Sequence, residues 1–199
     1  MTFRSIAFVA AICAALPAIS AQAQQTTRVR GVIQHVDGPV IGVKAADGTE
    51  VKVSLADNVT VFGVAKGSLA DIKVGDFVGV GAMPQPDGSQ KAIQVVIFPE
   101  AMRGTGEGFR PWDRPNSTMT NATVATAVAG IDGRELLVKY KDGEKKIVVT
   151  PESAILAYAA GERSELKPGA AIAINGAVRH PDGTLQAARV NVGRGGLVP

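Results

Sequence analysis

Several residue types are scarce in this sequence, and each shortage excludes a class of function. The 199 residues include one cysteine, Cys13, two histidines, one tryptophan and only 5% aromatic side chains. Cys13 lies in a segment that we expect to be removed, so the mature chain has no thiol for disulfides, thiolate catalysis, iron–sulfur clusters or cysteine-bound zinc. Basic residues exceed acidic ones by only three, which argues against a surface for nucleic acid.

The remaining composition is that of a folded chain with many turns. Hydrophobic residues make up 46% and charged residues 20% of the sequence, which also holds 23 glycines and 11 prolines. This balance excludes a disordered chain and predicts a packed core built mainly from valine, isoleucine, alanine and leucine.

The first 23 residues have the pattern of an export signal. Arg4 is followed by an apolar run from Ile6 to Leu16 and then by Ala21-Gln22-Ala23, the small-x-small pattern that precedes signal cleavage. The apolar run is too short to span a bilayer. We therefore expect cleavage near Ala23 and a periplasmic or secreted protein that is not membrane-spanning and begins at Gln24.

The sequence repeats itself after 95 positions. Three turn signatures recur at this spacing: Asp37-Gly38 and Asp132-Gly133, Asp47-Gly48 and Asp142-Gly143, and Pro86-Asp87-Gly88 and Pro181-Asp182-Gly183. Three signatures in one register indicate two copies of a unit of about 70 residues.

Each unit has the pattern of strands joined by tight turns. Apolar and polar residues alternate from Val51 to Leu55, and Asp-Gly pairs favour hairpins. Ser68 with an acidic residue three positions later predicts one helical turn, and Ser164-Glu165-Leu166 holds the corresponding place. Five strands with a short helix between the third and fourth is the order of an OB-fold barrel.

We therefore predict an all-β protein of two tandem five-stranded OB-like barrels joined by an ordered linker rich in glycine and proline that carries the tryptophan. The expected segments are a signal peptide at 1–23, a first barrel at 24–98, the linker at 99–121 and a second barrel at 122–199. A single β-sandwich built from both units is the alternative.

These signals also resemble a known family. The opening Arg30-Gly31, the Asp-Gly hairpins, the run from Leu69 to Val78 and the segment from Ala92 to Val95 resemble an exported bacterial domain of unknown function with tandem OB-like β-barrel units. The second unit departs from the pattern, since it has Gly169-Ala170 and Thr123-Val124 at the corresponding places. The resemblance implies export and supplies no catalytic residue.

The linker contains the most distinctive candidate residues. Trp112 and Phe109 stand among its glycines and prolines, and Arg103 and Arg110 lie nearby. One interpretation is that the aromatic side chains fill the space between the barrels while arginine–carboxylate pairs fix the loop. The other is that the linker binds a ligand, with Trp112 stacking on it and Arg103 or Arg110 holding an anionic group.

Both histidines occur as His-x-Asp, and this spacing suggests a second kind of site. His35 with Asp37 and His180 with Asp182 place an imidazole and a carboxylate two residues apart, which puts both on one face of a strand and offers a weak divalent-metal site. The simpler interpretation is that these residues are exposed and the aspartates serve the turns.

No motif for catalysis or for a cofactor stands out. The sequence has no Gly-x-Ser-x-Gly elbow, phosphate loop or zinc-protease signature. We predict a non-catalytic binding or interaction module without a cofactor, whose partner is an unidentified protein or small ligand of the cell envelope and not nucleic acid. The alternatives are a weak metal-binding accessory protein and a hydrolase with a site between the barrels.

Overall fold

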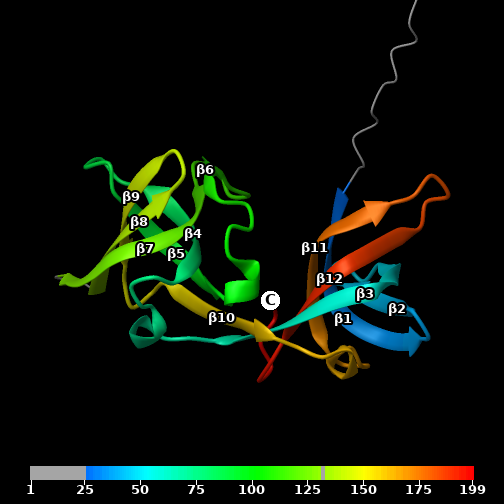
Figure 1. Cartoon of the computed structure of the whole chain (residues 1–199). Coiled ribbons are helices and arrows are strands. Elements are labelled where there is room, and N and C mark those ends of the chain that lie inside the picture. Colours follow the sequence, from blue (N-terminus) through cyan, green and yellow to red (C-terminus); the bar gives the residue numbers. More distant parts are fainter. Residues whose placement is uncertain (1–25, 131–132) are drawn as a thin grey trace, which may run out of the picture.

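The computed structural model describes residues 26–130 and 133–199, and these residues confirm the predicted all-β class (Figure 1). The predicted signal peptide, with Cys13 and the cleavage site at Ala23, lies outside the described residues. The strands are β1 (Thr26–Asp37), β2 (Val40–Ala45), β3 (Glu50–Lys66), β4 (Phe77–Pro84), β5 (Gln90–Phe98), β6 (Gly108–Pro111), β7 (Thr118–Gly130), β8 (Gly133–Tyr140), β9 (Gly143–Val149), β10 (Ala154–Ala160), β11 (Ala171–Arg179) and β12 (Leu185–Gly193). Three short 3₁₀ turns are η1 (Leu69–Asp71), η2 (Glu100–Met102) and η3 (Arg163–Glu165). Across residues 26–130 and 133–199, no helix is long and apolar enough to cross a membrane.

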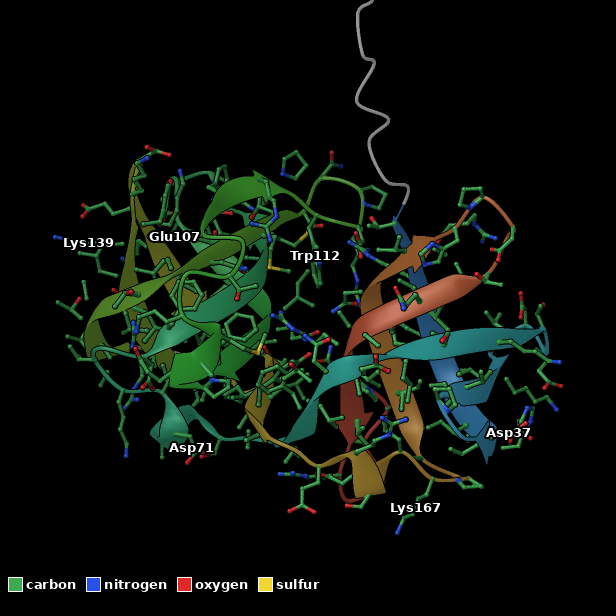
Figure 2. All side chains as sticks on the ribbon, turned by 45° about the vertical axis from the view of Figure 1, so that its right-hand side comes forward. Asp37, Asp71, Glu107, Trp112, Lys139 and Lys167 are labelled. Atoms are coloured by element: carbon green, nitrogen blue, oxygen red, sulfur yellow. The ribbon has the colours of Figure 1, made fainter. Side chains whose placement is uncertain are left out.

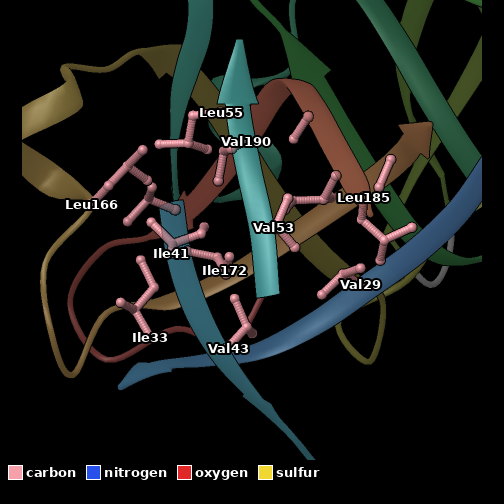
Figure 3. Packing of buried hydrophobic residues seen from close by; sticks show 14 of the residues in the cluster. Val29, Ile33, Ile41, Val43, Val53, Leu55, Leu166, Ile172, Leu185 and Val190 are labelled. Atoms are coloured by element: carbon pink, nitrogen blue, oxygen red, sulfur yellow. The ribbon is translucent and has the colours of Figure 1, made fainter. Parts of the chain in front are cut away.

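Five strands close into a first ring. β1 pairs with β2, β2 with β3, β3 with β12 in parallel, β12 with β11, and β11 returns to β1. Alternate residues of these strands point inward, as the period of two requires. They form one core (Figure 3), whose largest fully buried side chains are Ile33, Ile41, Ile172 and Ile174.

A second ring has the same arrangement when its strands are counted by their place in the repeats. β7 pairs with β8, β8 with β9, β9 with β5 through a short parallel contact, β5 with β4, and β4 returns to β7. Its core contains Val78, Val80, Leu136, Val138 and Ile147, all fully buried. The two rings lie side by side in Figure 1, and each encloses its own core.

The composition of the rings differs from the expected one-unit-per-barrel arrangement. The first ring combines residues 26–66 with residues 171–193, whereas the second ring lies within residues 77–149. The physical reason is the course of β3. The alternation in the sequence predicts a strand only around Val51 to Leu55, but β3 is continuous from Glu50 to Lys66 and leads the chain out of the first ring. β11 and β12 then occupy the places beside β1 and β3.

β10 belongs to neither ring and pairs with the end of β3. β10 runs antiparallel to the end of β3, with Ala157 opposite Ala65 and Tyr158 opposite Val64, and it runs parallel to β5 on its other side. Tyr158 stacks edge-on against Phe98 of β5 at 5.7 Å between ring centroids. Burial raises the pKa of the Tyr158 hydroxyl. β10 is therefore the element that joins the two rings into one sheet.

Two of the predicted turns, at Asp87-Gly88 and Asp182-Gly183, use their aspartates in the same way, whereas Asp132 of the turn predicted at Asp132-Gly133 lies outside the described residues. Asp87 Oδ1 accepts hydrogen bonds from the Ser89 amide and hydroxyl at 3.0 and 2.7 Å, and Asp182 Oδ1 accepts the same pair from Thr184 at 2.9 and 2.7 Å. The intervening glycines adopt the left-handed conformation, with φ of 82° and 85°, which a side chain would strain.

The predicted helical turns are 3₁₀ turns, and one begins elsewhere than expected. The Asp71 carboxylate accepts hydrogen bonds from the Ser68 amide and hydroxyl at 2.7 and 2.8 Å, as the sequence indicates. In the second unit the capping residue is Glu162, whose amide donates to Glu165 at 3.0 Å. Ser164 instead lies inside the turn, because a glutamate can fill the same capping place.

Candidate functional site

The linker is an ordered layer packed on the second ring. β6 adds to the first part of β7 on the side opposite β4, with Phe109 beside Thr120 and Pro111 beside Thr118. Met102 is only 4% exposed and anchors the beginning of the linker. The side-chain amide of Asn121 donates to the Thr105 carbonyl at 2.8 Å. These contacts support the prediction of an ordered linker.

Arg103, one of the predicted ligand contacts, is engaged with the protein itself. Its guanidinium makes two hydrogen bonds to the Glu100 carboxylate, at 2.6 and 2.7 Å, and one to the Gly75 carbonyl at 3.0 Å. The same contact lowers the pKa of Glu100 and raises that of Arg103. Arg103 thus holds the linker to the loop before β4.

Arg110 is also turned toward the linker backbone. Its Nη1 donates to the Gly106 carbonyl at 2.7 Å. Because it neighbours Phe109 on β6, its side chain points to the opposite face of that strand from Phe109. Arg110 therefore stabilises the linker, and it is not among the residues that line the groove described next.

Trp112 lies flat against the outside of the second ring. A Cβ atom on Gly81 of β4 would overlap the indole, so the absence of a side chain at Gly81 creates the seat for Trp112. The Trp112 amide donates to the Ser117 carbonyl at 3.0 Å, which closes the loop after β6. Figure 2 labels Trp112 at the upper side of the molecule, in the region between the two rings.

Trp112 and Phe109 contribute to an open surface groove of about 690 Å³. Three prolines complete its apolar lining, and the loop 113–118 forms the other wall. Besides the two aromatic residues, the lining consists of Pro84, Pro111, Asp113, Arg114, Pro115, Asn116, Ser117 and Thr118. The Phe109 side chain is 41% exposed. Aromatic and proline surfaces with a few polar groups are the usual lining of a ligand site.

Charged side chains surround the groove. The Arg114 guanidinium lies 5.9 Å from the centre of the Trp112 ring, and the Lys145 ammonium lies 4.5 Å from the centre of the Phe109 ring. Arg28 of β1 forms an ion pair with Asp113. The hydrogen bond from Arg28, together with the charges of Arg28 and Arg30, lowers the pKa of the Asp113 carboxyl.

The Arg28–Asp113 pair also connects the linker to the first ring. Both partners are about half exposed, at 56% and 46%, so the pair is worth roughly 0–1 kcal/mol. The groove therefore lies where the linker, the second ring and the outer face of β1 meet.

The structure places His35 and Asp37 on β1 of the first ring, apart from the linker. The imidazole of His35 covers Gly42 of β2, where a Cβ atom would overlap it, and its Nδ1 lies 3.6 Å from Glu50 Oε1. Asp37 ends β1 at the hairpin. These contacts give His35 a packing role on its neighbouring strands.

His180 and Asp182 belong to the turn between β11 and β12. The His180 amide and carbonyl both make backbone hydrogen bonds, to Thr184 and Gly183. The Thr184 hydroxyl and amide lower the pKa of the Asp182 carboxyl and engage one of its oxygens. Among residues 26–130 and 133–199, no three His, Cys, Asp or Glu side chains gather as metal ligands.

Sequence reasoning found the aromatic residues of the groove but missed its charged rim. Arg28 and Asp113 are 85 positions apart, and no local pattern connects them. For Arg114 the sequence did offer a signal, because it lies two positions after Trp112 in a cluster of aromatic and proline residues.

The chain was compared with known proteins. No protein-family model matches it, and no curated protein and no solved structure matches it.

Proposed function

We propose that this protein is a non-catalytic binding module of the cell envelope, with its ligand site in the groove lined by Phe109 and Trp112. The observation that carries the proposal is an exposed aromatic surface on an ordered support. Phe109 stays 41% exposed, although β6, which bears it, is hydrogen-bonded to β7 along its length. A rigid strand that presents an aromatic ring to solvent is suited to stacking with a ligand.

The barrel architecture supports the same proposal. Counted by their place in the repeats, the strands of both rings have the order first, second, third, fifth, fourth, with the third and fifth parallel, although the second ring takes its fourth and fifth strands, β4 and β5, from the first repeat. We propose that both rings are OB-like barrels. Barrels of this order bind oligosaccharides and oligonucleotides. The net charge of only +3 favours the former, and the predicted export would place the ligand in the cell envelope.

The proposed function is tested through Trp112, the only tryptophan of the chain. The protein beginning at Gln24 is titrated with soluble oligosaccharides and with proline-rich peptides while Trp112 emission and heat of binding are recorded. We expect at least one of these to change the emission with saturation, and Phe109→Ala to weaken that binding about tenfold or more.

Val128→Ala is the matched control for Phe109→Ala. Val128 is also on the second ring and is 55% exposed, so its truncation removes exposed apolar surface without touching the groove. Circular dichroism verifies that both variants are folded. If no ligand changes the emission, or if Phe109→Ala binds as well as the original protein, the groove is not the site.

Export is proposed on the sequence of residues 1–23 and has its own test. The protein produced with its full sequence in a bacterial host is isolated from the periplasmic fraction, and its intact mass is measured. We expect the mass of a chain that begins at Gln24. Recovery of the uncleaved chain from the cytoplasm would contradict the prediction.

A further inference from the structure

We propose that the groove binds an acidic oligosaccharide, with Arg114 as the contact for a carboxylate and Trp112 and Phe109 as stacking surfaces for sugar rings. This inference rests on the proposed function and specifies the chemistry of the ligand. The two aromatic rings and the three prolines of the groove offer flat apolar surfaces, which match the flat C–H faces of pyranose rings better than an extended peptide.

The charges around the groove are unequal. Four cations lie at or beside it, Arg28, Arg30, Arg114 and Lys145, and the lining contains one carboxylate, that of Asp113. Within the described parts of the chain, Arg30, Arg114 and Lys145 make no ion pair. The lining itself holds one cation, Arg114, and one carboxylate, Asp113. Because Arg28 already pairs with Asp113, Arg114 and the neighbouring Arg30 and Lys145 are the positive charges left for an anionic ligand.

Arg114 is positioned to act together with Trp112. Its guanidinium lies over the indole, 5.9 Å from the ring centre, so a sugar ring that stacks on this face takes the place of the guanidinium. The displaced fork of N–H donors then meets the carboxylate of the sugar at the edge of the indole. Guanidinium groups bind carboxylates through two parallel hydrogen bonds. The backbone carbonyl of Arg114 accepts from the Ser117 amide and hydroxyl at 3.1 and 2.7 Å, which fixes its position.

Asp113 is an internal competitor for the ligand's carboxylate. It already occupies Arg28, and the half-exposed pair is weak enough for an incoming carboxylate to replace it. Removing the charge of Asp113 should therefore strengthen the binding of an acidic ligand and leave that of a neutral one unchanged. Changes at Arg114 and at Asp113 both act through charge, so specific recognition is separated from general attraction by a control that removes a positive charge away from the groove.

The experiment compares two forms of one sugar. The protein beginning at Gln24 is titrated with trigalacturonate and with its fully methyl-esterified form, which keeps the rings and loses the charges. Trp112 emission and calorimetry report binding. We expect the acidic form to bind at least tenfold more tightly, and its affinity to fall between 50 and 300 mM salt, as contacts between exposed charges do.

Three variants sharpen the test. Arg114→Gln should weaken trigalacturonate binding about tenfold, and Asp113→Asn should strengthen it severalfold. Arg163→Gln is the control, since it removes one positive charge beside the hairpin between β1 and β2, at the opposite end of β1 from Arg28, where Arg163 donates to the Gly38 carbonyl at 3.4 Å. It should bind like the original protein.

Each contrary outcome has a distinct meaning. Equal binding of the two sugar forms, or an Arg114→Gln variant with unchanged affinity, overturns the acidic specificity but leaves the groove as the ligand site. Binding of hexaglutamate in preference to trigalacturonate overturns the sugar. Failure of both sugars while neutral oligosaccharides or peptides change Trp112 emission refutes this inference alone, whereas silence of every ligand refutes the proposed function as well.

Discussion

The two rings share one strand order and differ in what has been added to them. The second ring carries the extra strand β6 and the linker, which provide Trp112, Phe109 and the groove. On the first ring, the outer face carries the His35 imidazole over Gly42, charged side chains such as Arg28, and the exposed Val32 and Val36 of β1. The comparison teaches that the barrel is a common support and that the candidate function belongs to the segment inserted between the repeats.

The rings also differ in whether they are built from one continuous stretch of chain. The second ring is made from one stretch of chain, 77–149, whereas the first is made from the two ends of the described chain, 26–66 and 171–193. The second ring is thus nested within the first. The predictions below test this difference and then the local features that accompany it.

The largest effect is expected when the chain is divided. A fragment of residues 67–157 contains every residue of the second core, and it should unfold cooperatively with a change in Trp112 emission. A fragment of residues 122–199 holds three strands of one ring and two of the other, so neither core is complete and its amides should exchange as in an unfolded chain. Circular dichroism and hydrogen exchange measure both. A cooperatively folded 122–199 fragment would instead support one barrel per repeat.

A matched pair of core truncations should act on different rings. Ile147 and Ile172 are both fully buried and both lie in the second repeat, but they belong to different cores. Each change to alanine should cost about 2–4 kcal/mol. Ile172→Ala should accelerate hydrogen exchange in β1, β2 and β3, and Ile147→Ala in β4, β5 and β7. Acceleration by Ile172→Ala confined to β7–β9 would contradict the strand pairing.

Two glycines covered by rings allow the outer surfaces to be compared. Gly81→Ala must displace Trp112 and should cost about 1–2 kcal/mol, with a red shift of the tryptophan emission. Gly42→Ala displaces the exposed His35 imidazole, which can rotate into solvent, and should cost no more than about 0.5 kcal/mol. Chemical denaturation measures both. Equal costs would mean that Trp112 is no more firmly seated than His35.

An effect smaller than that of Gly81→Ala is expected from an ion pair that fastens the end of the first ring. Arg194 donates two hydrogen bonds of 2.9 Å to Glu165, and this pairing lowers the pKa of the Glu165 carboxyl from 4.5 to about 2. The contribution to stability is therefore complete above pH 4.5 and lost as the pH falls through about 2.

Glu165→Gln tests this contribution. Because the pair is partly exposed, the variant should be less stable by about 1 kcal/mol at pH 7, and the difference from the original protein should vanish near pH 2. Lys139 and Glu144 form a more exposed pair on the second ring, with 3.7 Å between Nζ and Oε2, and Glu144→Gln serves as the control. A difference that stayed constant with pH would show that the pair does not act through its charge.

The sequence allowed much of the local structure to be predicted. Alternation identified the strands, and Asp87-Gly88 and Asp182-Gly183 identified hairpins whose hydrogen bonds the structure confirms. The partners of the strands could not be predicted, because the repeats resemble each other and β4–β5 and β11–β12 suit the same places in a ring. The choice depends on whether β3 turns back or continues to Lys66. Asp57 and Asn58, residue types that are common in turns, lie within the continuous strand, so the local signal points to the wrong choice.

The candidate site shows the same limit. Trp112 and Phe109 could be identified because aromatic residues are unusual in a linker rich in glycine and proline. The engagement of Arg103 by Glu100 and the approach of Arg28 to Asp113 depend on how the linker folds over both rings. The resemblance to an exported family, the segment boundaries and the His-x-Asp metal sites stay predictions.

The nesting of one ring within the other has a consequence for the order of folding. More than a hundred residues separate the end of β3 from the beginning of β11, so the outer ring has to close a long loop, and such distant contacts form slowly. During synthesis the N-terminus emerges first, so the inner ring can be completed as soon as β9 has emerged. Meanwhile β1 and β3 keep unpaired edges, which are templates for aggregation, until the last two strands arrive. The final residues of this protein thus determine how long its first residues remain vulnerable.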